Sequence, residues 1–167
     1  MSDKTVPAAM PAAGQPAPPI ALFGDDDSLH SLADRRGQWT VVYFYPADDT
    51  PGCTTEACEF RDSFASLRAE GAEVWGISPD GTASHGKFRA KFDLPFTLLA
   101  DEGASVAAAY GAWVEKNRAG RTYMGVQRST FLVGPDGTIA RAWHSVTPAG
   151  HAAEVRETLI AAKRTGA

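Results

Sequence analysis

The chain has 167 residues, of which 44% are hydrophobic and 22% charged, a length and composition that suit one folded domain and exclude a chain that is disordered throughout. The formal net charge is -4, with 16 Lys and Arg against 20 Asp and Glu, which argues against a dedicated nucleic-acid partner. Two cysteines are too few for a disulfide scaffold or a four-thiolate zinc site, and no apolar run approaches the ~20 residues that a membrane helix needs.

The beginning of the chain is rich in proline and alanine. Prolines interrupt every apolar run there, so the continuous apolar stretch of a secretory signal is missing. We expect residues 1–12 to form a disordered or polyproline-like tail and residues 13–167 to form a single domain. Because no export signal is recognised, we also expect a cytoplasmic protein. In that reducing compartment, two neighbouring cysteines are more often reactive or metal-bound than permanently bridged.

The first half of the predicted domain alternates strands and helices. Residues 41–45 are a short apolar run of β-branched and aromatic side chains, typical of a strand that is covered on both faces. Apolar residues at helical spacing predict a helix over residues 54–67. A second strand is expected over residues 73–78 and a short helix over residues 83–92.

The second half ends in a hairpin and a helix. We expect an extended segment over residues 96–99 and a helical one over 105–110. Residues 129–133 and 138–143 flank a Gly-Pro-Asp-Gly turn and predict a β-hairpin. A terminal helix is expected from residue 148 to 163, with the proline at its start, where a missing N–H costs little. This order predicts a mixed α/β fold in which helices flank a central β-sheet.

The segment most informative about chemistry lies where the strand over residues 41–45 ends and the next helix begins, the usual place for ligands in α/β sheets. Thr50 is suited to the N-cap of that helix and Pro51 to its first position. Cys53 then falls in the first helical turn. Free backbone N–H groups and the helix dipole stabilise a thiolate there.

Ionisation alone does not make Cys53 an enzyme nucleophile. An ordinary thiol is about 3% ionised at pH 7, so complete ionisation raises reactivity at most ~30-fold. Part of that gain is lost because a less basic thiolate is a poorer nucleophile. A fast reaction also needs groups that polarise the electrophile and stabilise its leaving group. Thr50 offers a hydroxyl, but a cation has to come from elsewhere in the fold.

The spacing of the two cysteines predicts a conformational change if they bridge. On a regular helix, Cys53 and Cys58 are separated by roughly 8.6 Å between Cα atoms. A disulfide tolerates less than about 7 Å. The two residues can therefore bridge only if the first turns of the helix unwind.

Other interpretations of these residues stay open at this point. Cys58 alone could be a small buried apolar residue. The acidic run over residues 25–27 is expected to be a solvated turn rather than a cation site. A metal site is disfavoured because no two histidines have ligand spacing; they are His30, His85, His144 and His151.

The motif around Cys53 resembles that of the peroxiredoxins, specifically the Q type, also called bacterioferritin comigratory proteins. The family's Pro-x-x-x-Thr-x-x-Cys motif is met by Pro46, Thr50 and Cys53. The resemblance extends from about Gly14 to the last helix, and it includes the blocks at 94–96, 109–111 and 123–131. It implies a thioredoxin-like fold and thiol-dependent reduction of hydroperoxides, without a cofactor or metal.

The resemblance also implies a role for each motif residue. Cys53 would be the peroxidatic nucleophile that becomes a sulfenic acid. Thr50 would hydrogen-bond the peroxide, and Pro46 would shield the site from water. Arg128 matches the family's active-site arginine and would supply the missing cation.

Cys58 matches the resolving cysteine of those members that carry it five residues after the peroxidatic one. It would form an intramolecular disulfide with Cys53, which a thioredoxin-type reductant would reduce again. The sequence has no third cysteine, and we expect a monomer. Glu56 is close enough to tether Arg128 or to stabilise the helix, and we favour helix stabilisation.

Two rival functions use the same fold. A thiol–disulfide oxidoreductase would act on protein disulfides, but its usual Cys-x-x-Cys motif is missing from the sequence. A redox sensor would use the bridge between Cys53 and Cys58 to change a partner surface. Repeated turnover with peroxide and a reductant separates a peroxidase from both.

Overall fold

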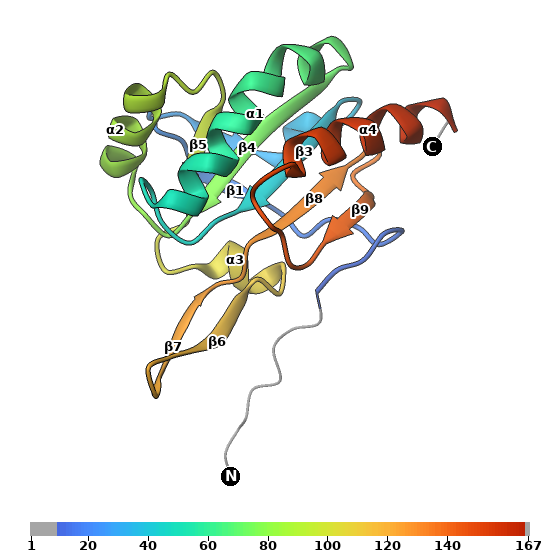
Figure 1. Ribbon diagram of the computed structural model, residues 1–167. Coiled ribbons are helices and arrows are strands. Elements are labelled where there is room, and N and C mark those ends of the chain that lie inside the picture. Colours follow the sequence, from blue (N-terminus) through green and yellow to red (C-terminus); the bar gives the residue numbers. More distant parts are fainter. Residues whose placement is uncertain (1–9, 166–167) are drawn as a thin grey trace.

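The computed structural model describes residues 10–165, which form fourteen helices and strands around one mixed sheet (Figure 1). The elements are β1 (Ala21–Phe23), β2 (Leu29–Ser31), the 3-10 helix η1 (Leu32–Arg35), β3 (Trp39–Phe44), α1 (Pro51–Ala69), β4 (Ala72–Ser78), α2 (Thr82–Phe92), β5 (Thr97–Ala100), α3 (Ser105–Ala109), β6 (Trp113–Arg118), β7 (Arg121–Val126), β8 (Ser129–Val133), β9 (Ile139–Trp143) and α4 (His151–Arg164). None of these helices is long and apolar enough to cross a membrane.

The main sheet has five strands in the order β5-β4-β3-β8-β9. β3 pairs in parallel with β4, and β4 with β5, whereas β8 runs antiparallel to both β3 and β9. β3 is therefore central, and all six of its residues are buried. Its carboxyl end leads directly into the loop before α1, so this loop lies at one end of the sheet (Figure 1).

Hydrophobic clusters cover both faces of the sheet, as expected for side chains that alternate along a strand. Val41 and Tyr43 of β3 belong to the cluster that contains residues of α1, α2 and α4. Val42 and Phe44 belong to the opposite cluster, which contains residues of α3. Figure 1 shows α1 and α4 together on one face of the sheet, and the two helices are in contact. Helices thus flank a central mixed sheet, as the sequence predicts.

Every helix and strand predicted from the sequence is present, with shifted ends. The helix expected over residues 54–67 extends to Pro51 and Ala69. The terminal helix, in contrast, begins at His151 and not at residue 148, so the expected position of Pro148 at its start is wrong. The cause is Gly150, whose φ of +83° lies outside the helical region and whose N–H donates to Glu59 instead.

Two hairpins were not predicted. β1 pairs with β2, and β6 pairs with β7 through a turn at Ala119 and Gly120, both of which have positive φ. The acidic run over residues 25–27 forms a turn, but Asp25 is not solvated. Its carboxylate accepts hydrogen bonds from the Leu98 N–H at 3.1 Å and from Arg89 at 3.2 Å.

The tail expected over residues 1–12 falls mostly outside the described residues. Of its described part, Met10 packs against the core and Pro11 is buried. Gly14 and Gln15 then exchange backbone hydrogen bonds with Ile139 of β9. The packed part of the chain therefore reaches at least to residue 10.

Candidate active site

Cys53 lies in the first turn of α1, where the sequence predicts it. Thr50 occupies the N-cap position with an extended backbone, and Pro51 is the first helical residue. The first helical hydrogen bond runs from Thr54 N to Thr50 O at 2.8 Å, so the N–H of Cys53 precedes the helical ladder. The Cys53 side chain is 1% exposed. Its sulfur is therefore held near the positive end of the helix dipole, shielded from water.

Arg128 supplies the cation that the sequence argument requires. It follows β7 and precedes β8, and the antiparallel register pairs the next residue, Ser129, with Phe44 at the end of β3. This register brings Arg128 beside the loop that follows β3. Its Nη2 atom lies 3.3 Å from Sγ of Cys53, within hydrogen-bonding distance for sulfur. A residue 75 positions away in the chain thus contacts the thiol.

Glu56 holds the other side of the guanidinium. Nη1 of Arg128 donates to Oε1 of Glu56 at 2.7 Å, and the Glu56 side chain is 1% exposed. The preference for helix stabilisation is therefore wrong, and Glu56 is a tether for Arg128. The sequence spacing of three residues from Cys53 was the only signal for this role.

The electrostatics of this triad follow from burial. Burial raises the pKa of Glu56 to about 7, even though Arg128 opposes the shift. Within residues 10–165, the second carboxylate oxygen, Oε2, has no hydrogen-bond partner. Burial lowers the pKa of Arg128, but Glu56 and Cys53 outweigh it and the net pKa is raised. One permanent cation is thus shared between a buried carboxyl group and a thiol.

Thr50 and Pro46 lie in the loop over residues 46–50 that joins β3 to α1. The Thr50 hydroxyl does not cap the helix, because it donates to the carbonyl oxygen of Ala47 at 2.9 Å. Its lone pairs are left to accept a hydrogen bond. Pro46 is half-buried directly after Tyr45.

Cys58 lies on the same unbroken helix as Cys53. It is half-buried, and both thiols are free. A separation of five residues on a regular helix corresponds to roughly 8.6 Å between Cα atoms, more than the ~7 Å that a disulfide tolerates. The structure therefore represents the reduced state with a folded α1.

Two neighbours of the site were not predicted. A Cβ atom added at Gly52 would lie 3.1 Å from Nη2 of Arg128, which is tighter than normal packing. Lys116 of β6 donates to the Val126 carbonyl, and burial followed by the charge of Arg128 lowers its pKa. The Pro-Gly pair before Cys53 was an available signal for the first. No local signal marks the second, because β6 was not predicted.

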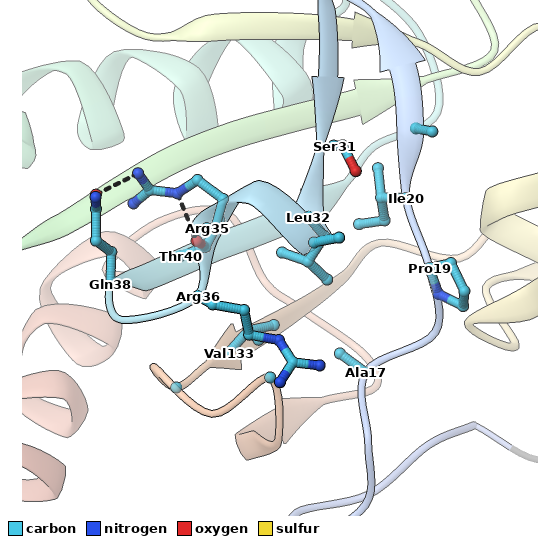
Figure 2. A pocket seen from close by; sticks show the side chains of 14 residues that line it. Ala17, Pro19, Ile20, Ser31, Leu32, Arg35, Arg36, Gln38, Thr40 and Val133 are labelled. Carbon is cyan, nitrogen blue, oxygen red and sulfur yellow. Dashed lines mark hydrogen bonds between the residues drawn. The ribbon is translucent and has the colours of Figure 1, made fainter.

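A separate cavity of about 210 Å³ lies at the opposite end of the sheet (Figure 2). Thr40 at the start of β3 and Val133 at the end of β8 line it, together with Leu32 and Arg36. It contains none of the residues around Cys53. The buried Cys53 thiol at the start of α1 is thus not part of this cavity.

Comparisons with known proteins find similar sequences and a similar fold. The model of the AhpC/TSA family matches residues 13–142. Peroxiredoxin Bcp of Bacillus subtilis is 46% identical over 146 residues, which cover 87% of this chain and 93% of the relative. A putative peroxiredoxin bcp of Coxiella burnetii is 47% identical over 142 residues, or 85% of this chain and 94% of the relative.

A solved structure is also similar. It is the bacterioferritin comigratory protein of Xanthomonas campestris, studied for its alkyl peroxide reduction activity. The TM-score is 0.82 at 37% identity, over 85% of this chain and 90% of that chain.

Proposed function

The chain belongs to the AhpC/TSA family and is a peroxiredoxin of the bacterioferritin comigratory (Q-type) group, a thiol-dependent peroxidase with a thioredoxin-like fold, and we propose that its reaction runs through Cys53. The Cys53 thiolate attacks one oxygen of the hydroperoxide, so an S–O bond forms and the O–O bond breaks. The electron pair leaves with the other oxygen, which takes up a proton to give water or an alcohol. Cys53 is oxidised to a sulfenic acid, and the peroxide is reduced.

The observation that carries this proposal is the contact of 3.3 Å between Arg128 Nη2 and Cys53 Sγ. A guanidinium stays charged at any physiological pH and offers several N–H donors in one plane. It therefore stabilises the thiolate before the reaction and the negative charge on the leaving oxygen during it. Glu56 holds the guanidinium in this orientation through the hydrogen bond of 2.7 Å.

Thr50 and Pro46 complete the proposed site. Because the Thr50 hydroxyl donates to Ala47, its oxygen is oriented to accept the O–H of the hydroperoxide. Half-buried Pro46 has no N–H and limits the access of water to the sulfur. Both roles are supported by the fit to the family motif.

Cys58 is the proposed resolving residue. Its thiol attacks the sulfenic sulfur of Cys53, so an S–S bond forms and one molecule of water leaves. The first turns of α1 must unwind for this step, because the two residues are too far apart on the folded helix. A thioredoxin-type dithiol then reduces the disulfide and is itself oxidised. This recycling needs a reducing compartment such as the cytoplasm.

We infer that the substrates include alkyl hydroperoxides and hydrogen peroxide. The alkyl substrates are supported by the activity for which the Xanthomonas campestris relative was studied. We further infer that the protein acts as a monomer, since both cysteines of the cycle lie on one helix of one chain.

The test is the oxidation of the reduced protein by hydrogen peroxide, followed through the fluorescence of its tryptophans. A rate constant about a thousandfold or more above that of a free thiol is expected, because ionisation alone gives at most ~30-fold. Cys53→Ser is expected to remove the reaction. A rate within ~30-fold of the free thiol would refute a peroxidase site and favour a disulfide oxidoreductase or a sensor.

A further inference from the structure

A buried cluster of polar side chains connects the loop over residues 46–50 to α2 and does not include the residues assigned above. At its centre is the carboxylate of Asp48, whose side chain is 6% exposed. Its Oδ1 accepts a hydrogen bond from the Tyr45 hydroxyl at 2.6 Å, and its Oδ2 accepts one from Ser84 at 2.7 Å. The same Oδ2 lies 2.8 Å from Nδ1 of His85.

Both ring nitrogens of His85 face acceptors. Nε2 lies 2.9 Å from the carbonyl oxygen of Leu99, which can only accept, and Nδ1 lies 2.8 Å from Oδ2 of Asp48. The Tyr45 hydroxyl also lies 3.3 Å from Nδ1, but it donates its proton to Asp48 in the shorter contact of 2.6 Å, so it too presents a lone pair to Nδ1. A neutral imidazole has one N–H and one lone pair, so one of the two contacts would set a lone pair against an oxygen. Only the imidazolium donates to both. The His85 side chain is 0% exposed, so no water could relieve the repulsion between a lone pair of a neutral ring and the facing oxygen, and this contact would cost free energy.

The proton does not lie on Asp48, because both of its oxygens already accept hydrogen bonds from hydroxyl groups. Burial raises the pKa of Asp48, but hydrogen bonds from His85, Tyr45 and Ser84 outweigh it and the net pKa is lowered. Tyr45 remains a donor, because burial raises its pKa well above the ordinary value. The hydrogen-bond geometry is therefore that of a buried imidazolium–carboxylate pair with two neutral hydroxyl donors.

This ion pair fastens the loop to the elements beneath it. Besides its side chain, the backbone N–H of Asp48 donates to Oδ2 of Asp80 at 2.7 Å, in the turn between β4 and α2. The following residue is held far less. Asp49 has a φ of +57° and makes one exposed ion pair, with Lys91, of a kind that contributes little to stability.

The two steps of the proposed cycle make opposite demands on this segment. Reaction with peroxide needs Thr50 and the first turn of α1 in place beside Cys53. The disulfide with Cys58 needs the same turn unwound. Both demands are satisfied if Asp48 is fixed and Asp49, which lies between Asp48 and the first turn of α1, is weakly held.

We propose that Asp48 and protonated His85 are positioning residues that anchor the loop before α1, so that Cys53 is held in its reactive geometry and unwinding begins only beyond Asp49. The proposal rests on the proposed function for the roles of Cys53 and Cys58. The ionisation of His85 does not depend on those roles and can be tested by itself.

The first measurement is nitrogen-15 NMR of the reduced protein labelled at its histidines. At neutral pH, both nitrogens of His85 are expected to carry protons. In Asp48→Asn, the side-chain amide donates to Nδ1, so His85 is expected to become neutral with its proton on Nε2. A neutral His85 in the unsubstituted protein would overturn the ion pair, whether or not Cys53 is the peroxidatic residue.

The second measurement is kinetic. His85→Asn can satisfy only one of the two acceptors, and we expect oxidation by hydrogen peroxide to slow about tenfold or more. Disulfide formation after a stoichiometric pulse of peroxide is expected to be unchanged or faster, because a looser loop unwinds more easily. The matched control is His30→Asn, which breaks an exposed pair with Asp26 of similar length, 3.0 Å. It is expected to change neither step.

The split between the two steps separates positioning from mere structural support. Parallel slowing of both steps in His85→Asn, or oxidation within twofold of the unsubstituted protein, would overturn the proposal. Should that variant fail to fold, Asp48→Asn decides, because it keeps each hydrogen-bonding position filled and removes the charges. Unchanged oxidation in Asp48→Asn together with a protonated His85 would overturn the proposal equally. Failure of the proposed function is recognised separately, as peroxide turnover that persists in Cys53→Ser.

Discussion

Replacement of Glu56 by glutamine tests the electrostatics of the site through stability. Burial raises the pKa of Glu56 from 4.5 to about 7, so the folded protein holds a proton that the unfolded chain releases. The contribution of Glu56 to the free energy of unfolding is therefore fully present below its pKa in the unfolded chain. It is lost as the pH rises through its pKa in the folded protein. The full loss is about 3 kcal/mol, because each unit of difference between the two pKa values corresponds to ~1.36 kcal/mol.

The measurement is urea denaturation of the reduced protein at about pH 5 and about pH 8, where most of that loss, about 2 to 3 kcal/mol, is expected. Glu56→Gln has no proton to lose at this position. Between the two pH values, its free energy of unfolding is therefore expected to fall by about 2 to 3 kcal/mol less than that of the unsubstituted protein. The difference between the two proteins cancels the titration of distant groups. Exposed Glu157, replaced by glutamine, is the matched control and is expected to behave like the unsubstituted protein.

The same pH dependence in the unsubstituted protein and in Glu56→Gln would refute this reasoning. It would mean that Glu56 is ionised in the folded protein as easily as in the unfolded chain. The ion pair with Arg128 would then outweigh the cost of burying the carboxylate.

Arg128→Ala removes the cation beside the thiol. Oxidation by peroxide, measured by stopped flow, is expected to slow by more than the ~30-fold that ionisation alone allows. A smaller loss that matches the change in thiolate fraction would mean that Arg128 only promotes ionisation of the thiol. Cys58→Ser is expected to react once with peroxide and to stop at the sulfenic acid, so an intramolecular bond seen by non-reducing mass analysis would contradict the resolving role. Gly52→Ala places a methyl group 3.1 Å from Nη2 of Arg128 and is expected to slow oxidation several-fold by shifting the guanidinium. Oxidation at the unsubstituted rate in that variant would mean that the guanidinium can move without loss.

The helices and strands that the sequence predicts are those in which hydrophobic side chains occupy the buried positions. Residues 41–45 are apolar at every position, because β3 is covered on both faces. β6 and β7 were missed for the opposite reason. Most of their residues are exposed or half-buried, so no hydrophobic alternation marks them, and backbone pairing through the turn at Ala119 and Gly120 forms the hairpin.

The local part of the site was readable from the sequence alone. Thr50, Pro51 and Cys53 lie within four positions, and the rules for helix N-termini suffice to put the thiol in the first turn of a helix. The same helix rule indicates that Cys53 and Cys58 cannot bridge without unwinding. These inferences depend only on neighbouring residues, whose relative geometry a regular helix dictates.

The family resemblance had named Arg128 as the cation of the site, but only the tertiary structure decided the contacts that Arg128, Glu56 and His85 make. Glu56 and Arg128 are 72 positions apart, and Asp48 and His85 are 37 apart. Their contacts depend on the pairing of β3 with β8 and on the packing of α2 beside the loop over residues 46–50. A shift of one residue in strand register would turn the paired side chains to the other face of the sheet. Strand pairing and helix packing, which no local pattern encodes, therefore bring the cation to the sulfur and the imidazole to Asp48.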